Sequence, residues 1–147
     1  MATGLAAVHQ TLSWVLMSES EPEIIRHLRG IRYIVINACH GGFSLSHAAI
    51  LRYHELQGQM IYFRTTEYAD ILLYYLDPAD PVASAWDDRD LARDDPYLVR
   101  VVKEMGGEAA GGLAATLKVV EIPESVAWHI QEYDGLEWVA ENHRTWS

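Results

Sequence analysis

The residues best suited to bind an anion lie in segment 41–46. Gly41 and Gly42 allow a tight turn between a predicted strand and a predicted helix, and Ser44 and Ser46 are alternative N-caps of that helix. Free backbone N–H groups and the helix dipole favour an anion such as a phosphate at such a position. Neither the dinucleotide-binding glycine pattern nor a phosphate-binding loop with its lysine is present. A serine-capped turn that binds nothing is the alternative interpretation.

Cys39 and His40 place a thiol beside an imidazole, the pair that nucleophilic catalysis uses. Neighbouring side chains on an extended strand point to opposite sides, so a buried thiol and a surface histidine are the favoured interpretation. A second polar group follows near the C-terminus, and its order matches no established metal-ligand spacing: His129, Glu137, Glu141 and His143. We therefore assign no catalytic residue and no metal site, and we expect no cofactor.

Charge and composition exclude several classes of function. The chain has 147 residues, is 50% hydrophobic and 22% charged, and has a formal net charge of −10, which is typical of one soluble domain and disfavours nucleic acid as a partner. It has no apolar run of membrane-spanning length and no pattern of a signal peptide. With Cys39 as its one cysteine, it cannot form an internal disulfide. We expect a cytoplasmic protein without a membrane partner.

The elements that position these residues follow from hydrophobic spacing and capping. Residues 1–30 predict two helices that form an N-terminal extension, and residues 31–147 predict a core domain with α/β character. Residues 31–37 predict a central strand covered on both faces, because β-branched residues follow one another with almost no alternation. The next helix ends near Gly58, and residues 60–63 predict another strand. Asp95 and Gly106 delimit a further helix, and residues 116–122 predict a half-buried strand.

Residues 64–94 have no clear periodicity and are left unassigned. Several aromatic residues lie in or beside this stretch, which makes it the expected place for a lid or an interface: Tyr74, Tyr75, Trp86 and Tyr97. The whole pattern predicts a single α+β or α/β domain with a mixed sheet of about four to five strands and a terminal β-hairpin.

Asp134 and Gly135 mark the turn of that hairpin. A two-residue loop pairs Glu132 with Glu137, whose like charges repel, and it mixes apolar and acidic residues on each face of the hairpin. Both effects destabilise the hairpin. We therefore predict a three-residue loop, 133–135, which places Ile130 opposite Trp138. That register gathers His129, Gln131, Glu137 and Glu141 on one polar face, which His143 extends.

Three blocks of sequence carry a family resemblance: residues 35–46 with Gly-Gly-Phe-Ser-Leu-Ser, residues 93–96, and residues 133–146 with Tyr-Asp-Gly-Leu-Glu-Trp and His-Arg-Thr-Trp. Together they resemble a family of short, largely uncharacterised proteins of tailed phages and large DNA viruses. His40 stands where that pattern has an aromatic residue, and the N-terminal helices are an addition to it. The resemblance implies no established activity. Small phage proteins often bind or sequester nucleotide signals of host defence, so it implies a binding role in the host-cell cytoplasm.

The sequence therefore predicts a binding protein for a small anionic, nucleotide-derived molecule. The expected site is the turn with its flanking residues and two residues of the C-terminal tail: Gly41, Gly42, Phe43, Ser44, Ser46, Arg144 and Trp146. One alternative is an enzyme acting on such a ligand through Cys39, Glu137 or His143. Another is a structural module that contacts a host protein. We also expect a homo-oligomer, most simply a dimer, with the N-terminal helices or the terminal hairpin in the contact.

Overall fold

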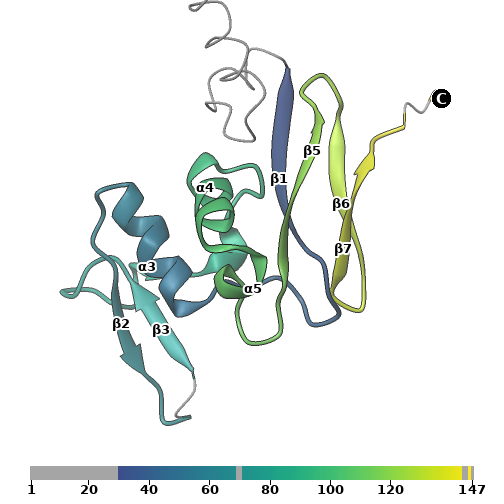
Figure 1. Ribbon diagram of the computed structural model, residues 1–147. Coiled ribbons are helices and arrows are strands. Elements are labelled where there is room, and N and C mark those ends of the chain that lie inside the picture. Colours follow the sequence, from purple (N-terminus) through teal and green to yellow (C-terminus); the bar gives the residue numbers. More distant parts are fainter. Residues whose placement is uncertain (1–29, 69–70, 144–145, 147) are drawn as a thin grey trace, which may run out of the picture.

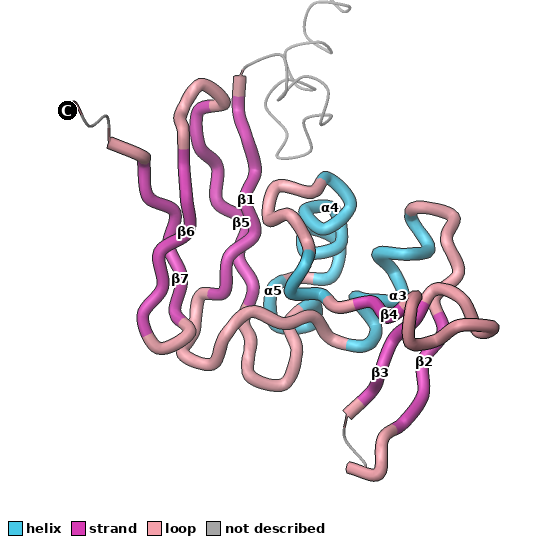
Figure 2. Tube along the Cα trace, turned by 180° about the vertical axis from the view of Figure 1, so that it is seen from behind, coloured by secondary structure: helices cyan, strands magenta, loops and turns pink. Residues whose placement is uncertain are grey.

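The computed structural model describes residues 30–68, 71–143 and 146, and it has an α+β fold (Figure 1). Its strands form three small antiparallel sheets: β1 with β5, β2 with β3 and β4, and β6 with β7. The helices α3, α4 and α5 lie between the β1–β5 pair and the β2–β3–β4 sheet, as both views show (Figures 1 and 2). The predicted N-terminal helices lie outside the described residues. Among the described helices, none has the length and apolar character needed to cross a membrane.

Strand β1 (Ile31–Asn37) is buried on both faces, as predicted, but the prediction of a central strand is wrong, because β1 belongs to a two-stranded sheet with β5. It pairs with β5 (Leu117–Pro123) in the register Val35↔Val119. Tyr33 and Val35 belong to the core cluster shared with the helices, whereas Ile34 and Ile36 are buried on the opposite face. Strand β7 contacts β1, and the β6–β7 pair lies beside β1 and β5 in both views (Figures 1 and 2).

The two longer helices begin where the sequence predicts. Helix α3 (His47–Leu56) is capped by Ser46, whose side chain accepts a hydrogen bond from the N–H of Ala49. Helix α4 (Pro96–Met105) is capped by Asp95, and Gly106 ends it at a φ of 84°. The short helix α5 (Gly107–Ala110) follows. The buried residues of these helices form the core with β1 and β5.

The unassigned stretch forms the second sheet. Strands β2 (Tyr62–Thr65), β3 (Leu72–Tyr75) and β4 (Ala85–Trp86) are followed by the 3-10 helix η1 (Asp88–Asp90). The predicted mixed sheet of four to five strands is wrong, because β2 pairs with β3, its neighbour along the chain, and not with β1. The edge of β1 that faces away from β5 is occupied by the main chain of Arg93, whose carbonyl accepts from the N–H of Val35 at 2.8 Å.

Strands β6 (Trp128–Tyr133) and β7 (Leu136–Glu141) pair in a register that corrects the predicted one. Tyr133 lies opposite Leu136, so the loop has two residues, Asp134 and Gly135, with φ values of 49° and 80°. Both positive φ values suit a tight hairpin turn. Glu132 and Glu137 are paired, but each carboxylate has another partner: Glu132 accepts from the N–H of Gly135, and Glu137 binds Arg93. These contacts offset the repulsion on which the prediction rested.

Candidate functional site

The three sequence blocks that carry the family resemblance meet in space. Arg93, from the second block, forms a bidentate ion pair with Glu137 of the third, with both N–O distances at 2.8 Å. The guanidinium also lies over the ring of Phe43, from the first block, at 3.5 Å from its centroid. The Arg93 and Glu137 side chains are only 19% and 9% exposed, so this junction is largely closed to solvent.

Asn37 extends the junction at the end of β1. It is fully buried, and its main-chain N–H donates to Glu137 Oε2 at 2.7 Å. Its side-chain N–H₂ donates to the carbonyls of Cys39 and Gly135, and its Oδ1 accepts from the N–H of Thr116. A buried polar group with this many partners fixes the surrounding backbone. The junction therefore holds the end of β1, the residue before β5 and the hairpin turn together through hydrogen bonds.

The Gly41–Gly42 turn packs against the chain itself. A Cβ at Gly135 would lie 2.3 Å from the N atom of Gly42 and 2.6 Å from that of Gly41. A Cβ at Gly41 would lie 2.1 Å from the carbonyl oxygen of Ala114. The hairpin turn thus lies directly against the amides on which the predicted anion site was based.

Ser44 and Ser46 of the predicted anion site already contact other parts of the protein. Ser46 Oγ donates to the carbonyl of Ala109 at 2.7 Å while it caps α3, and the Ser44 carbonyl accepts from Gly112. The N–H of Leu45 donates to Asp88 Oδ2 at 2.7 Å, so a carboxylate of the protein lies beside the start of α3. Trp146 is 88% exposed, and Arg144 lies outside the described residues.

The candidate catalytic residues are not brought together. The Cys39 thiol lies 3.3 Å from Asn37 Oδ1 and from the carbonyl of Ala114, and Glu137 is held by Arg93. His143 is exposed, and His129 lies on the opposite face of the hairpin from Glu137 in the observed register. The predicted common polar face is therefore wrong. Among the described residues no group of three or more His, Cys, Asp or Glu side chains is placed to hold a metal ion.

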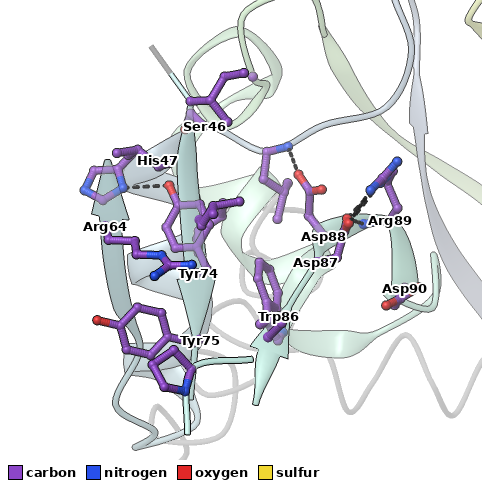
Figure 3. A pocket seen from close by; sticks show the side chains of 18 of the residues that line it. Ser46, His47, Arg64, Tyr74, Tyr75, Trp86, Asp87, Asp88, Arg89 and Asp90 are labelled. Atoms are coloured by element: carbon purple, nitrogen blue, oxygen red, sulfur yellow. Dashed lines mark hydrogen bonds and ion pairs between the residues drawn. The ribbon is translucent and has the colours of Figure 1, made fainter. Parts of the chain in front are cut away.

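A groove of about 1050 Å³ lies between the start of α3, strand β3 and the segment from β4 to η1. Figure 3 shows Arg64, Tyr74 and Tyr75 on one side and Asp88, Arg89 and Asp90 on the other. Most of the remaining lining is apolar, with Ile50, Ile71, Leu73, Val82 and Trp86 among its residues. Such a mixture of apolar walls and a few polar groups is typical of ligand sites.

The polar groups of the groove differ in how they are paired. His47 Nδ1 and the Tyr74 hydroxyl are hydrogen-bonded at 2.7 Å, and Arg89 is paired with Asp87. Burial raises the pKa of the Asp88 carboxyl above its ordinary value, and the nearby Asp87 carboxylate raises it further. Arg64 forms no ion pair with any residue that the structure describes.

Sequence reasoning missed Arg64 and Asp88 because both lie in the stretch without clear periodicity. The signal that could have found the groove was the aromatic group noted there. Tyr74, Tyr75 and Trp86 line the groove, whereas Tyr97 packs edge-on against Tyr53 instead.

Comparison of the chain with protein-family models, with curated proteins and with solved structures gives no match. The resemblance to phage and viral proteins therefore stays a prediction.

Proposed function

We propose that this protein binds a small anionic molecule of the nucleotide class in the groove beside α3, and that it does so without turnover. One observation carries the proposal: of the arginines that the structure describes, Arg64 alone lacks a carboxylate partner. The others are paired with Asp or Glu: Arg32, Arg52, Arg89, Arg93 and Arg100. The chain has a net charge of −10 and the groove also holds aspartates, so an arginine that lines it without being paired to any of them is suited to an anionic ligand.

The walls of the groove indicate what else the ligand contains. Tyr74, Tyr75 and Trp86 supply aromatic surface, and Tyr75 is held by stacking on Tyr62 at 5.8 Å between ring centroids. Aromatic side chains favour a planar ring by stacking and by burial of apolar area. The volume of the groove, about 1050 Å³, is slightly above the roughly 300–1,000 Å³ of small-ligand sites. A nucleotide combines a planar base with an anionic phosphate, which matches both features.

Binding without chemistry is supported by the state of the groove's reactive groups. The Ser46 hydroxyl already caps α3 and donates to Ala109, so it is poorly placed to act as a nucleophile. His47 is hydrogen-bonded to Tyr74, not to a serine or cysteine. Nucleophilic catalysis requires a nucleophile and a base within hydrogen-bond reach of each other, and these contacts do not provide that pair.

A thermal-shift panel of nucleotides tests the proposal. A ligand present at about 100 times its dissociation constant stabilises the folded chain by about 2.7 kcal/mol. For a domain of this size that corresponds to a rise in Tm of roughly 5–10 °C. Mass spectrometry of the recovered nucleotide should show it unchanged. Failure of every nucleotide to raise Tm would contradict binding, and a nucleotide converted to product would favour the enzyme instead.

A protein partner is a second candidate, because apolar side chains stand exposed around the groove. Ile71, Val82 and Leu113 are more than half exposed. Exposed apolar surface of this kind also marks protein contacts. A partner that binds equally well to the protein with Arg64→Gln, while no nucleotide binds, would favour this candidate over the first.

A further inference from the structure

The backbone of β3 bonds alternately to its two neighbours. The N–H of Thr66 donates to the carbonyl of Ile71 at 3.1 Å, in the register of the β2–β3 pair, so alternate residues 71, 73 and 75 bond toward β2. On the other side, the N–H of Leu76 donates to the carbonyl of Ser84 at 3.0 Å, and Tyr74 pairs with Trp86. Residues 72, 74 and 76 therefore point their N–H and C=O groups toward β4.

Strand β4 ends before it reaches Leu72. Continued in register, the pairing would place Asp88 opposite Leu72, but Asp88 begins η1 and its carboxylate bonds to the N–H of Leu45. On this side Leu72 makes no hydrogen bond to any residue in the described part of the chain. Leu72 lines the groove, and its N–H and C=O point to the side on which Trp86 and Asp88 line it.

We propose that the N–H and C=O of Leu72 read the edge of the ligand's ring, an inference that rests on the proposed function. A nucleobase presents an acceptor next to a donor on its pairing edge, which is the complement of one residue's donor and acceptor. Arg64 belongs to the neighbouring strand, where it pairs with Leu73, and Figure 3 shows its side chain reaching from β2 toward β3. The base therefore lies along the edge of β3 and the phosphate lies at Arg64.

The length of the free edge favours a base over an extended peptide. Tyr74 and Tyr75 are already paired with β4, so Leu72 is the residue of β3 that offers backbone groups to a ligand. A peptide that adds to a sheet uses a row of such groups. The carboxylates of Asp88 and Asp90 on the opposite side repel a phosphate, which further restricts the anionic group to the end of the groove at Arg64.

Two substitutions at the same position separate the backbone from the side chain. Leu72→Pro removes the N–H that faces the groove and breaks no ladder bond to β2, because proline is tolerated where the N–H points to an open edge. Leu72→Ala keeps the N–H and removes most of the side chain. Nucleoside monophosphates should bind the Leu72→Pro protein at least about tenfold more weakly than the Leu72→Ala protein. Equal affinities would overturn the assignment.

Ribose 5-phosphate is the matched probe, because it keeps the sugar and phosphate and lacks the base. It should bind the wild-type protein at least about tenfold more weakly than a nucleoside monophosphate. Equal binding of the two ligands would overturn the inference that Leu72 binds the base, but not the proposed function. The absence of any nucleotide binding would overturn both. If the Leu72→Pro protein fails to fold, hydrogen exchange of the wild-type Leu72 amide decides: slower exchange with nucleotide supports the inference, and unchanged exchange contradicts it.

Discussion

Arg93 and Glu137 form a bidentate ion pair although 44 positions separate them in the sequence. The pair joins the segment before α4 to strand β7, and Asn37 at the end of β1 donates its main-chain N–H to the same carboxylate. This pair therefore connects the hairpin to the segment that leads into α4.

Removal of the Glu137 carboxylate should strongly destabilise the fold. Glu137→Ala leaves the mostly buried Arg93 guanidinium without its partner, which costs about 3 kcal/mol of unfolding free energy. Glu55→Ala is the matched control, since it removes a carboxylate from an exposed ion pair with Arg52 and should change stability little. Urea denaturation measures both variants. Equal stability of the two proteins would show that the junction does not hold the hairpin.

Gly135 should tolerate a methyl group less well than a glycine with similar backbone angles. Gly135→Ala places a Cβ against the backbone N atoms of Gly41 and Gly42 at a φ of 80°. Gly58→Ala meets a φ of 65° with no atom within 4 Å. The control should lose about 1 kcal/mol from backbone strain alone, and Gly135→Ala should lose clearly more. Similar melting temperatures would show that the hairpin turn does not lie against the glycine turn.

His54 should make stability fall in mildly acidic solution. Its side chain is 1% exposed, its Nδ1 bonds to Gln59, and its Nε2 has no hydrogen-bond partner among the described residues. Burial lowers the pKa of His54 below 6.5, so near that pH the unfolded chain binds more protons than the folded one. The unfolding free energy should therefore fall as pH drops below about 6.5, before most carboxylates titrate.

His54→Phe tests this effect, because it keeps a ring against Trp86 and removes the unpaired nitrogen. The variant should be more stable by about 1 kcal/mol and should lose the pH dependence between about pH 7 and pH 5. A wild-type profile in the His54→Phe protein would contradict the assignment.

The local elements could be predicted from the sequence, but the register and the sheets could not. The ends of β1 and α4 follow from β-branched residues and from the caps Asp95 and Gly106, which act within a few residues. The hairpin register depends on Arg93, a distant cation that relieves the repulsion at Glu137. Pairwise rules within the hairpin could not include that contact.

The groove was hidden from sequence reasoning for a similar reason. The proposal that Arg64 binds an anion depends on the carboxylate partners of the other described arginines, and these partners are known only from the structure. Leu72 contributes through its backbone, which no residue type reveals. The serines and glycines of the expected anion site could be recognised from their residue types. In the structure they contact Ala109, Gly112 and Gly135 instead of leaving an open site.

We also propose that the chain forms a dimer through the hairpin face that points away from β1. Trp138 is 40% exposed on that face and donates its indole N–H to Gln131 at 2.9 Å. Light scattering of the full chain should give twice the mass of one chain, and Trp138→Ala should lower it to that of a monomer. A monomeric wild-type protein would contradict the proposal, and a dimer that survives the substitution would place the contact elsewhere.

Nucleotide binding at Arg64 is tested most directly by calorimetric titration of nucleoside monophosphates into three proteins: the wild type, Arg64→Gln and Lys118→Gln. Both substitutions remove one positive charge from an exposed position on a strand, but Lys118 lies on β5, outside the residues that line the groove. We expect equal affinity for the wild type and Lys118→Gln, and an affinity at least about tenfold lower for Arg64→Gln, because a charge-assisted contact is lost. Equal affinity of the two variants, or no binding to the wild type, would contradict nucleotide binding at Arg64.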